Sequence, residues 1–152
     1  MLKKEILLPV GLILSTVMLF STAGNYMKVS RAVHSFTVQV SEDCRVGRDL
    51  EFTVCFTSDS PLEIRLPFLR AVAFAGGQYC GGQNYDWTVN PPVFSSTGGF
   101  TQAVRVPLSD RENDRRLDDN WSVELFGHFA IPGFLKESFI KRHFFTKVEY
   151  TQ

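Results

Sequence analysis

The feature that most constrains the fold is an alternation of apolar and polar residues with a period of two. It is clearest in the segments 34–40 and 50–56, and the apolar positions of the second segment are Leu50, Phe52, Val54 and Phe56. Successive side chains of a strand point to opposite faces, so this period is typical of strands with one buried face. No useful helical period follows residue 33. We therefore expect a mainly β fold.

Further alternation and frequent turn signals predict how the strands are organised. The pattern continues through 62–68, where Pro67 lacks a backbone donor and predicts an edge, a bulge or a break. It returns in 101–108, and glycine and proline clusters at 76–82, 91–92 and 95–99 predict loops. Seven or eight short strands in about 120 residues favour an antiparallel two-sheet sandwich of immunoglobulin-like kind. A small barrel is the alternative.

The N-terminal segment predicts where this domain folds. Residues 6–27 contain no ionisable side chain except the phenol of Tyr26, and they follow Lys3 and Lys4. About 20 apolar residues can span a bilayer, whereas cleavage after Ala23 would make the segment a signal peptide. Both interpretations stay open. We expect an anchor or signal peptide at 1–27, a connector at 28–33 and an extracytoplasmic domain at 34–152, whether periplasmic, lumenal or secreted.

The last two predicted strands suggest a contact surface. Pairing Trp121–Ile131 antiparallel with Ile140–Tyr150, across a loop at 132–139, places Phe126 opposite Phe145 and His128 opposite His143. These four residues would lie on the face away from the core. Adjacent outward aromatics are typical of contact sites, so we expect this face to bind a partner. The two histidines could share a metal ion, but exposed polar rings are the preferred interpretation, and we expect no metal site.

Three cysteines, Cys44, Cys55 and Cys80, are an odd number without zinc-type spacing. In an exported chain we expect one disulfide, Cys44 to Cys80 first and Cys55 to Cys80 second, with three reduced thiols as the alternative.

Aromatic residues also gather at the glycine-rich segment. Tyr79, Tyr85 and Trp87 alternate there with amide side chains. Such a cluster could stack on a sugar or anchor a protein interface. The alternative is that Trp87 is buried and the tyrosines cover it.

Composition narrows the function. A formal net charge of zero disfavours nucleic-acid binding. No catalytic motif is present, so we expect neither an enzyme nor a cofactor. The acidic run 110–120 also contains arginines, and we expect a solvated loop rather than a calcium site. The sequence favours a non-enzymatic interaction module, tethered to the membrane through residues 6–27 as an accessory subunit of a membrane or envelope protein complex. The alternative is a secreted or periplasmic protein that binds a small ligand or glycan through the Tyr79–Trp87 loop.

Overall fold

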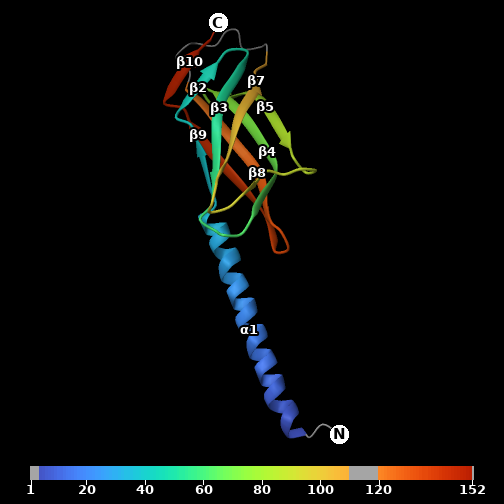
Figure 1. Cartoon of the computed structure of the whole chain (residues 1–152). Coiled ribbons are helices and arrows are strands. Elements are labelled where there is room, and N and C mark those ends of the chain that lie inside the picture. Colours follow the sequence, from blue (N-terminus) through green and yellow to red (C-terminus); the bar gives the residue numbers. More distant parts are fainter. Residues whose placement is uncertain (1–3, 110–119, 152) are drawn as a thin grey trace.

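The computed structural model describes residues 4–109 and 120–151, with the side chains of the helix described from Ser15 onward. One long helix, α1, projects from a sandwich of two β-sheets, and the C-terminus lies at the opposite end of the sandwich (Figure 1). The elements are α1 Lys4–Ser35, β1 Thr37–Val40, β2 Asp43–Val46, β3 Asp49–Thr57, β4 Ile64–Ala75, β5 Gln78–Asp86, β6 Val93–Phe94, β7 Phe100–Pro107, β8 Trp121–Ile131, β9 Leu135–Phe144 and β10 Lys147–Tyr150.

The first sheet, sheet A, is built around β3. Strand β7 pairs antiparallel with the whole of β3, from Asp49 opposite Pro107 to Phe56 opposite Phe100. Strands β1 and β2 pair in succession with the other side of β3, and β10 lies parallel to β2. The alternating residues Leu50, Phe52, Val54 and Phe56 are all buried between the sheets, as the sequence predicted.

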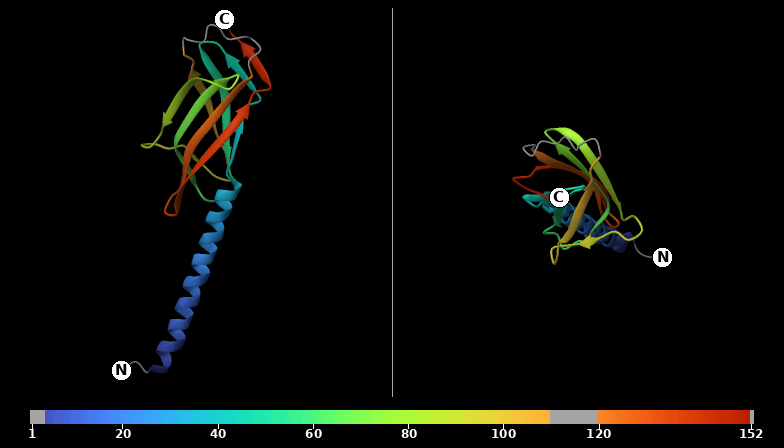
Figure 2. Two further views of the ribbon diagram at one scale, coloured as in Figure 1. Left: turned by 180° about the vertical axis from the view of Figure 1, so that it is seen from behind. Right: turned by 90° about the horizontal axis from the view of Figure 1, so that it is seen from above.

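The second sheet, sheet B, is built around β4 and β8. Strands β5 and β6 pair with one side of β4, β8 pairs with the other, and β9 lies beyond β8. The β4 register shifts between Arg65 and Phe68, which confirms the irregularity predicted at Pro67. The mainly β, two-sheet architecture is therefore confirmed, whereas an immunoglobulin-like fold is not (Figure 2).

The last turns of α1 are part of the domain. Ala32 is fully buried, and Val29 and Val33 pack against the core. Ser35 Oγ lies 2.9 Å from Ser58 Oγ and accepts the Asp59 N–H at 3.1 Å. Residues 28–33, expected to form a connector, are the last turns of α1, and some of their side chains pack against one end of the sandwich.

The rest of α1 extends away from the sandwich (Figure 1). Val17, Met18, Leu19 and Phe20 are 61%, 65%, 69% and 74% exposed. Four consecutive residues go around most of a helical turn, so this part of the helix is apolar on all sides. Within the residues that the structure describes, no helix is both long enough and apolar enough to cross a membrane.

The predicted register of the final hairpin was wrong. Phe126 pairs with Ile140, His128 with Ser138 and Val123 with His143. The chain turns earlier than expected because Pro132 and Gly133, with φ +79°, occupy a tight turn closed by the Phe134 N–H donating to the Ile131 carbonyl at 3.0 Å. Strand β9 ends at Phe144, and the chain then crosses to sheet A as β10.

The predicted disulfide is also not confirmed. All three cysteines lie within the described residues, and none of them forms a disulfide. Cys44 points inward from β2, whereas Cys55 alternates with the buried residues of β3 and points outward. Cys80 lies in the other sheet, where its thiol donates to the Gln78 carbonyl at 3.3 Å. Cys55 therefore points away from the core in which Cys80 is buried, and Cys44 and Cys80, although both buried, lie in different sheets.

Candidate functional site

The outer face of sheet B carries a continuous aromatic and aliphatic surface. We call it the outer aromatic patch, and its members are Phe68, Val72, Phe74, Phe126, His128, Ile140 and Phe144. Strands β4, β8 and β9 contribute to it side by side. Beneath it, the alternate residues of β4 and β8 face the core, among them the fully buried Leu69, Ala71 and Leu125.

A backbone irregularity brings β4 into this face. Ile64 and Leu66 point into the core, so an uninterrupted strand would point Phe68 inward as well. The register shift around Pro67 changes the alternation, and Leu69 rather than Phe68 is buried. Phe68 therefore turns outward, opposite His128.

Three rings form the centre of the patch. The Phe126 and His128 rings meet edge to face with centroids 5.1 Å apart, and Phe68 lies 6.4 Å from Phe126 and 5.9 Å from His128. His128 Nδ1 lies 2.9 Å from Ser138 Oγ, which positions the imidazole. These contacts hold the rings in place, as expected of a preformed surface.

Strand β9 supplies the most exposed members. Ile140, opposite Phe126, is 70% exposed, and Phe144 is 62% exposed. Side chains of this size, next to aromatic rings on a face opposite the core, mark a contact surface.

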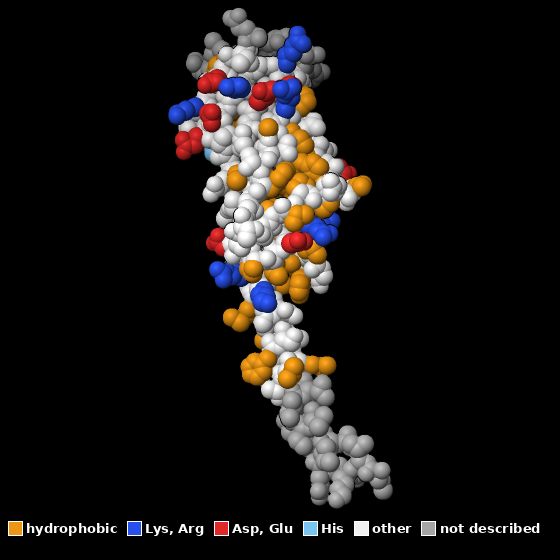
Figure 3. Space-filling view, in the orientation of Figure 1, with side chains coloured by type: hydrophobic (Ala, Val, Ile, Leu, Met, Phe, Trp, Pro, Cys, Tyr) orange, Lys and Arg blue, Asp and Glu red, His pale blue; other side chains and the backbone are white. Residues whose placement is uncertain are grey.

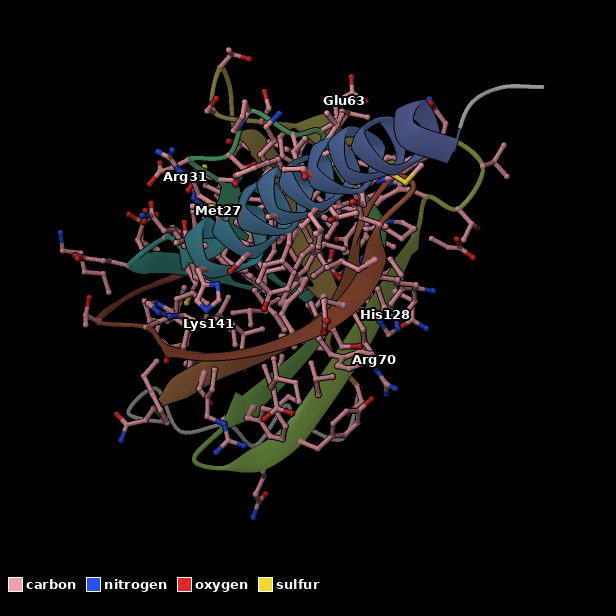
Figure 4. The ribbon with its side chains drawn as sticks, turned by 90° about the horizontal axis from the view of Figure 1, so that it is seen from below. Met27, Arg31, Glu63, Arg70, His128 and Lys141 are labelled. Carbon is pink, nitrogen blue, oxygen red and sulfur yellow. The ribbon has the colours of Figure 1, made fainter. Side chains whose placement is uncertain are left out.

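Charged side chains cross the patch. Arg142 Nη2 donates to Glu124 Oε2 at 2.9 Å, so the Glu124 carboxylate is paired. The Asp86 carboxylate accepts hydrogen bonds from the side chain and backbone of Thr88, and these bonds lower its pKa. Arg70 lies opposite Phe126 and is exposed. Figure 4 shows Arg70 and His128 near one another on the outer side of β4 and β8.

The structure brings together only some of the residues predicted for this site. Phe126 and His128 lie on the outward face, as predicted. Phe145 is buried, with its ring 5.3 Å from that of Phe52. His143 lies on the inward side of β9, against Phe145 at 5.1 Å, so it does not face His128. Sequence reasoning missed Ile140, and the Pro132-Gly133 dipeptide was the signal that could have corrected the register.

The Tyr79–Trp87 loop is mostly strand β5, and its aromatic residues separate. Tyr85 stacks on Trp87 at 5.5 Å, and its hydroxyl accepts the Arg105 N–H at 2.9 Å. Both rings thus join β5 to sheet A. Tyr79 instead lies on the outer face, 6.4 Å from Phe74. The predicted three-residue platform does not form.

Sheet A has a shallow cleft of about 400 Å³ on its outer face. Small residues such as Thr53 and Ala103 line its floor. Arg105 pairs there with Glu51 at 2.6 Å, and Arg45 pairs with Glu149 at 3.3 Å. On this side of the molecule, charged side chains lie both toward the end remote from the helix and near the helix (Figure 3). Because these charges satisfy one another, the cleft is a weaker candidate than the outer aromatic patch.

Neither surface carries the elements of a metal centre. No three His, Cys, Asp or Glu side chains are grouped to hold a metal ion in the part of the chain that the structure describes. The acidic run 110–120 falls, except for Asn120, outside the described residues.

Comparisons with known proteins were made by family, by sequence and by structure. No family model matches the chain, and no curated protein matches it. Among solved structures, it resembles a protein from Archaeoglobus fulgidus with 11% identity and a TM-score of 0.46, covering 74% of this chain and 98% of that one. It also resembles Spo0M, a sporulation control protein from Bacillus subtilis, with 11% identity and a TM-score of 0.36, covering 76% of this chain and 49% of that one. Neither likeness assigns a family.

Proposed function

We propose that the chain is a non-enzymatic interaction module that binds a protein partner through the outer aromatic patch. The observation that carries this proposal is the exposure of Ile140 and Phe144 beside the packed rings of Phe68 and Phe126. Aromatic side chains held rigidly on a sheet supply contact area with little loss of conformational freedom on binding.

We propose further that the N-terminal segment tethers this module at an extracytoplasmic membrane or envelope surface, as part of a larger assembly. The apolar sequence 6–27 and the preceding lysines support this. The exposed residues Val17–Phe20 also support it, because this turn of the helix presents apolar side chains on all sides and would be stabilised by apolar surroundings. Ala32 is buried against the sandwich and Val29 and Val33 pack beside it, so the last turns of the helix are held on the domain and the tether would also orient the patch.

The alternative of a glycan-binding or small-ligand-binding protein has less support. Tyr85 and Trp87 are engaged with each other and with β7, which leaves Tyr79 alone among the three predicted platform residues on the outer face.

Site-specific photo-crosslinking of the full chain in its own cells tests the binding surface. A photoreactive benzoyl-phenylalanine at position 140 should form an adduct with another protein. The same group at Thr53, exposed on the outer face of sheet A, should not. Phe68→Ala or Phe126→Ala should then reduce the adduct at 140. Adducts of equal yield from both positions, or none from position 140, would exclude this surface as the interface.

A separate experiment tests the location. A C-terminal fusion to a phosphatase that folds only outside the cytoplasm should be active. A fusion to a reporter that works only in the cytoplasm should be silent, and activity of that second fusion would contradict the proposed location.

A further inference from the structure

Arg70 is a cation near the middle of an apolar surface. Its cross-strand neighbours are Phe126 on β8 and Asn84 on β5, and Phe68 and Val72 lie two residues away on the same face of β4. Within residues 4–109 and 120–151, no carboxylate forms an ion pair with Arg70. Among the described residues, its exposed guanidinium therefore has no anionic partner.

The anionic groups of the same face are already engaged. Glu124 pairs with Arg142 at 2.9 Å, and Asp86 accepts hydrogen bonds from Thr88. The described outward positions of sheet B hold four cationic residues, Arg65, Arg70, Lys136 and Arg142, and two anionic residues, Asp86 and Glu124. Glu63, just before β4, pairs with Arg65 at 3.9 Å, which leaves the face with an excess of one positive charge, although the whole chain is formally neutral.

A partner that covers this face must also neutralise the charge of Arg70. A partner that buries the rings around it removes water from the guanidinium, and an unpaired buried charge opposes binding strongly. A carboxylate on the partner offsets this cost, because it pairs with the charge and can accept two parallel hydrogen bonds from the guanidinium. Arginine among aromatic residues is also a common centre of binding energy in interfaces.

The orientation of the face favours a protein partner over a lipid surface. The strands of sheet B run roughly lengthwise from the helix end of the sandwich to its far end (Figure 1). The patch therefore faces sideways, past the flank of the domain, and not toward the end from which α1 projects. A protein standing beside the domain can cover it.

We propose that the outer aromatic patch recognises a protein segment that presents a carboxylate to Arg70 and apolar side chains to Phe126 and Ile140. This inference rests on the proposed function, because it names the chemistry of the partner that the patch binds. Charge reversal at Arg70 should therefore reverse the charge preference of the patch and leave its apolar preference unchanged.

Peptide selection tests this without knowledge of the natural partner. Phage-displayed random dodecapeptides are selected in parallel on the purified full chain in detergent, on Arg70→Glu and on Arg48→Glu. Arg48, exposed in the turn between β2 and β3, is the matched control. The wild type and Arg48→Glu should enrich peptides with Asp or Glu beside aliphatic or aromatic residues. Arg70→Glu should enrich Lys or Arg in place of the acid.

Affinities of the enriched peptides separate the possible outcomes. Acidic peptides should bind Arg70→Glu at least about tenfold more weakly than the wild type, and Phe126→Ala should also weaken them. Peptides that depend on Phe126 but carry no acid and tolerate Arg70→Glu would overturn the carboxylate inference and leave the proposed binding surface intact. Peptides indifferent to both substitutions, or no enrichment at all, would count against the patch as well.

Discussion

Phe126 on β8 and Phe145, just after β9, offer a matched test of which side chains in this part of the chain are buried. Phe145 is 8% exposed, and its ring packs 5.3 Å from Phe52. Truncating a buried phenylalanine to alanine costs about 3 to 5 kcal/mol, so Phe145→Ala should lower the free energy of unfolding by about 4 kcal/mol. Phe126 lies on the partly exposed outer face, and Phe126→Ala should cost only about 1 kcal/mol.

Urea unfolding of the two variants measures this difference. Trp121 is buried and serves as a fluorescent probe, because unfolding exposes its indole to water. It lies close to the substituted position, since the Phe145 N–H donates to the Trp121 carbonyl at 3.0 Å. With an m-value of about 2 kcal/mol/M, Phe145→Ala should lower the midpoint by about 2 M and Phe126→Ala by about 0.5 M. Equal shifts, or a larger shift for Phe126→Ala, would refute the assignment of the two faces.

Three further predictions follow from local geometry. Gly133→Ala, at φ +79° with nothing within 4 Å, should cost about 1 kcal/mol in urea unfolding through backbone strain alone, whereas Gly98→Ala, which is equally open and not at positive φ, should cost less. Tyr85→Phe should cost about 1 kcal/mol because it removes the acceptor of the Arg105 N–H, and an unchanged midpoint would contradict the role of that hydroxyl as a link between β5 and β7. Burial and the nearby Asp43 raise the pKa of the Cys44 thiol from 9.0 to about 12. Between these pH values the unfolded chain loses this proton and the folded chain keeps it, so the free energy of unfolding should fall by up to about 1.4 kcal/mol per pH unit from pH 9 to 12. A Cys44→Ala variant with the same pH slope as the wild type would contradict this.

The fold was predictable wherever a strand has one buried and one exposed face. The alternation of Leu50, Phe52, Val54 and Phe56 placed β3 correctly, because each inward position is buried by the opposite sheet. Trp121–Ile131 was also predicted with the correct inward face. A central strand carries this signal in its own sequence, so no knowledge of its neighbours is needed.

The alternation of apolar and polar residues could not predict which face of β9 points inward. Strand β9 is an edge strand, and its inward positions include Glu137 and Lys141, which stay exposed because β9 has a single neighbour among the described strands. Polar residues therefore occupy both faces, and the alternation that specifies a register is lost. Only the turn could specify the pairing. The Pro132-Gly133 dipeptide does so, and a register read without it places every β9 side chain on the wrong face.

The candidate site depends on two such local irregularities. The shift at Pro67 turns Phe68 and Arg70 outward, and the tight turn at Gly133 places Ile140 opposite Phe126. Without the shift at Pro67, the residues of β4 that follow it would exchange faces. With a turn longer or shorter by one residue, those of β9 would do so, and in either case the patch would not form. Hydrophobic periodicity could therefore predict the strands around the site and yet identify only Phe126 and His128 among its seven members. The two features that assemble the site are each encoded by a proline, Pro67 and Pro132, so conservation of both prolines together with Arg70 in related chains is the pattern expected if this face is used for binding.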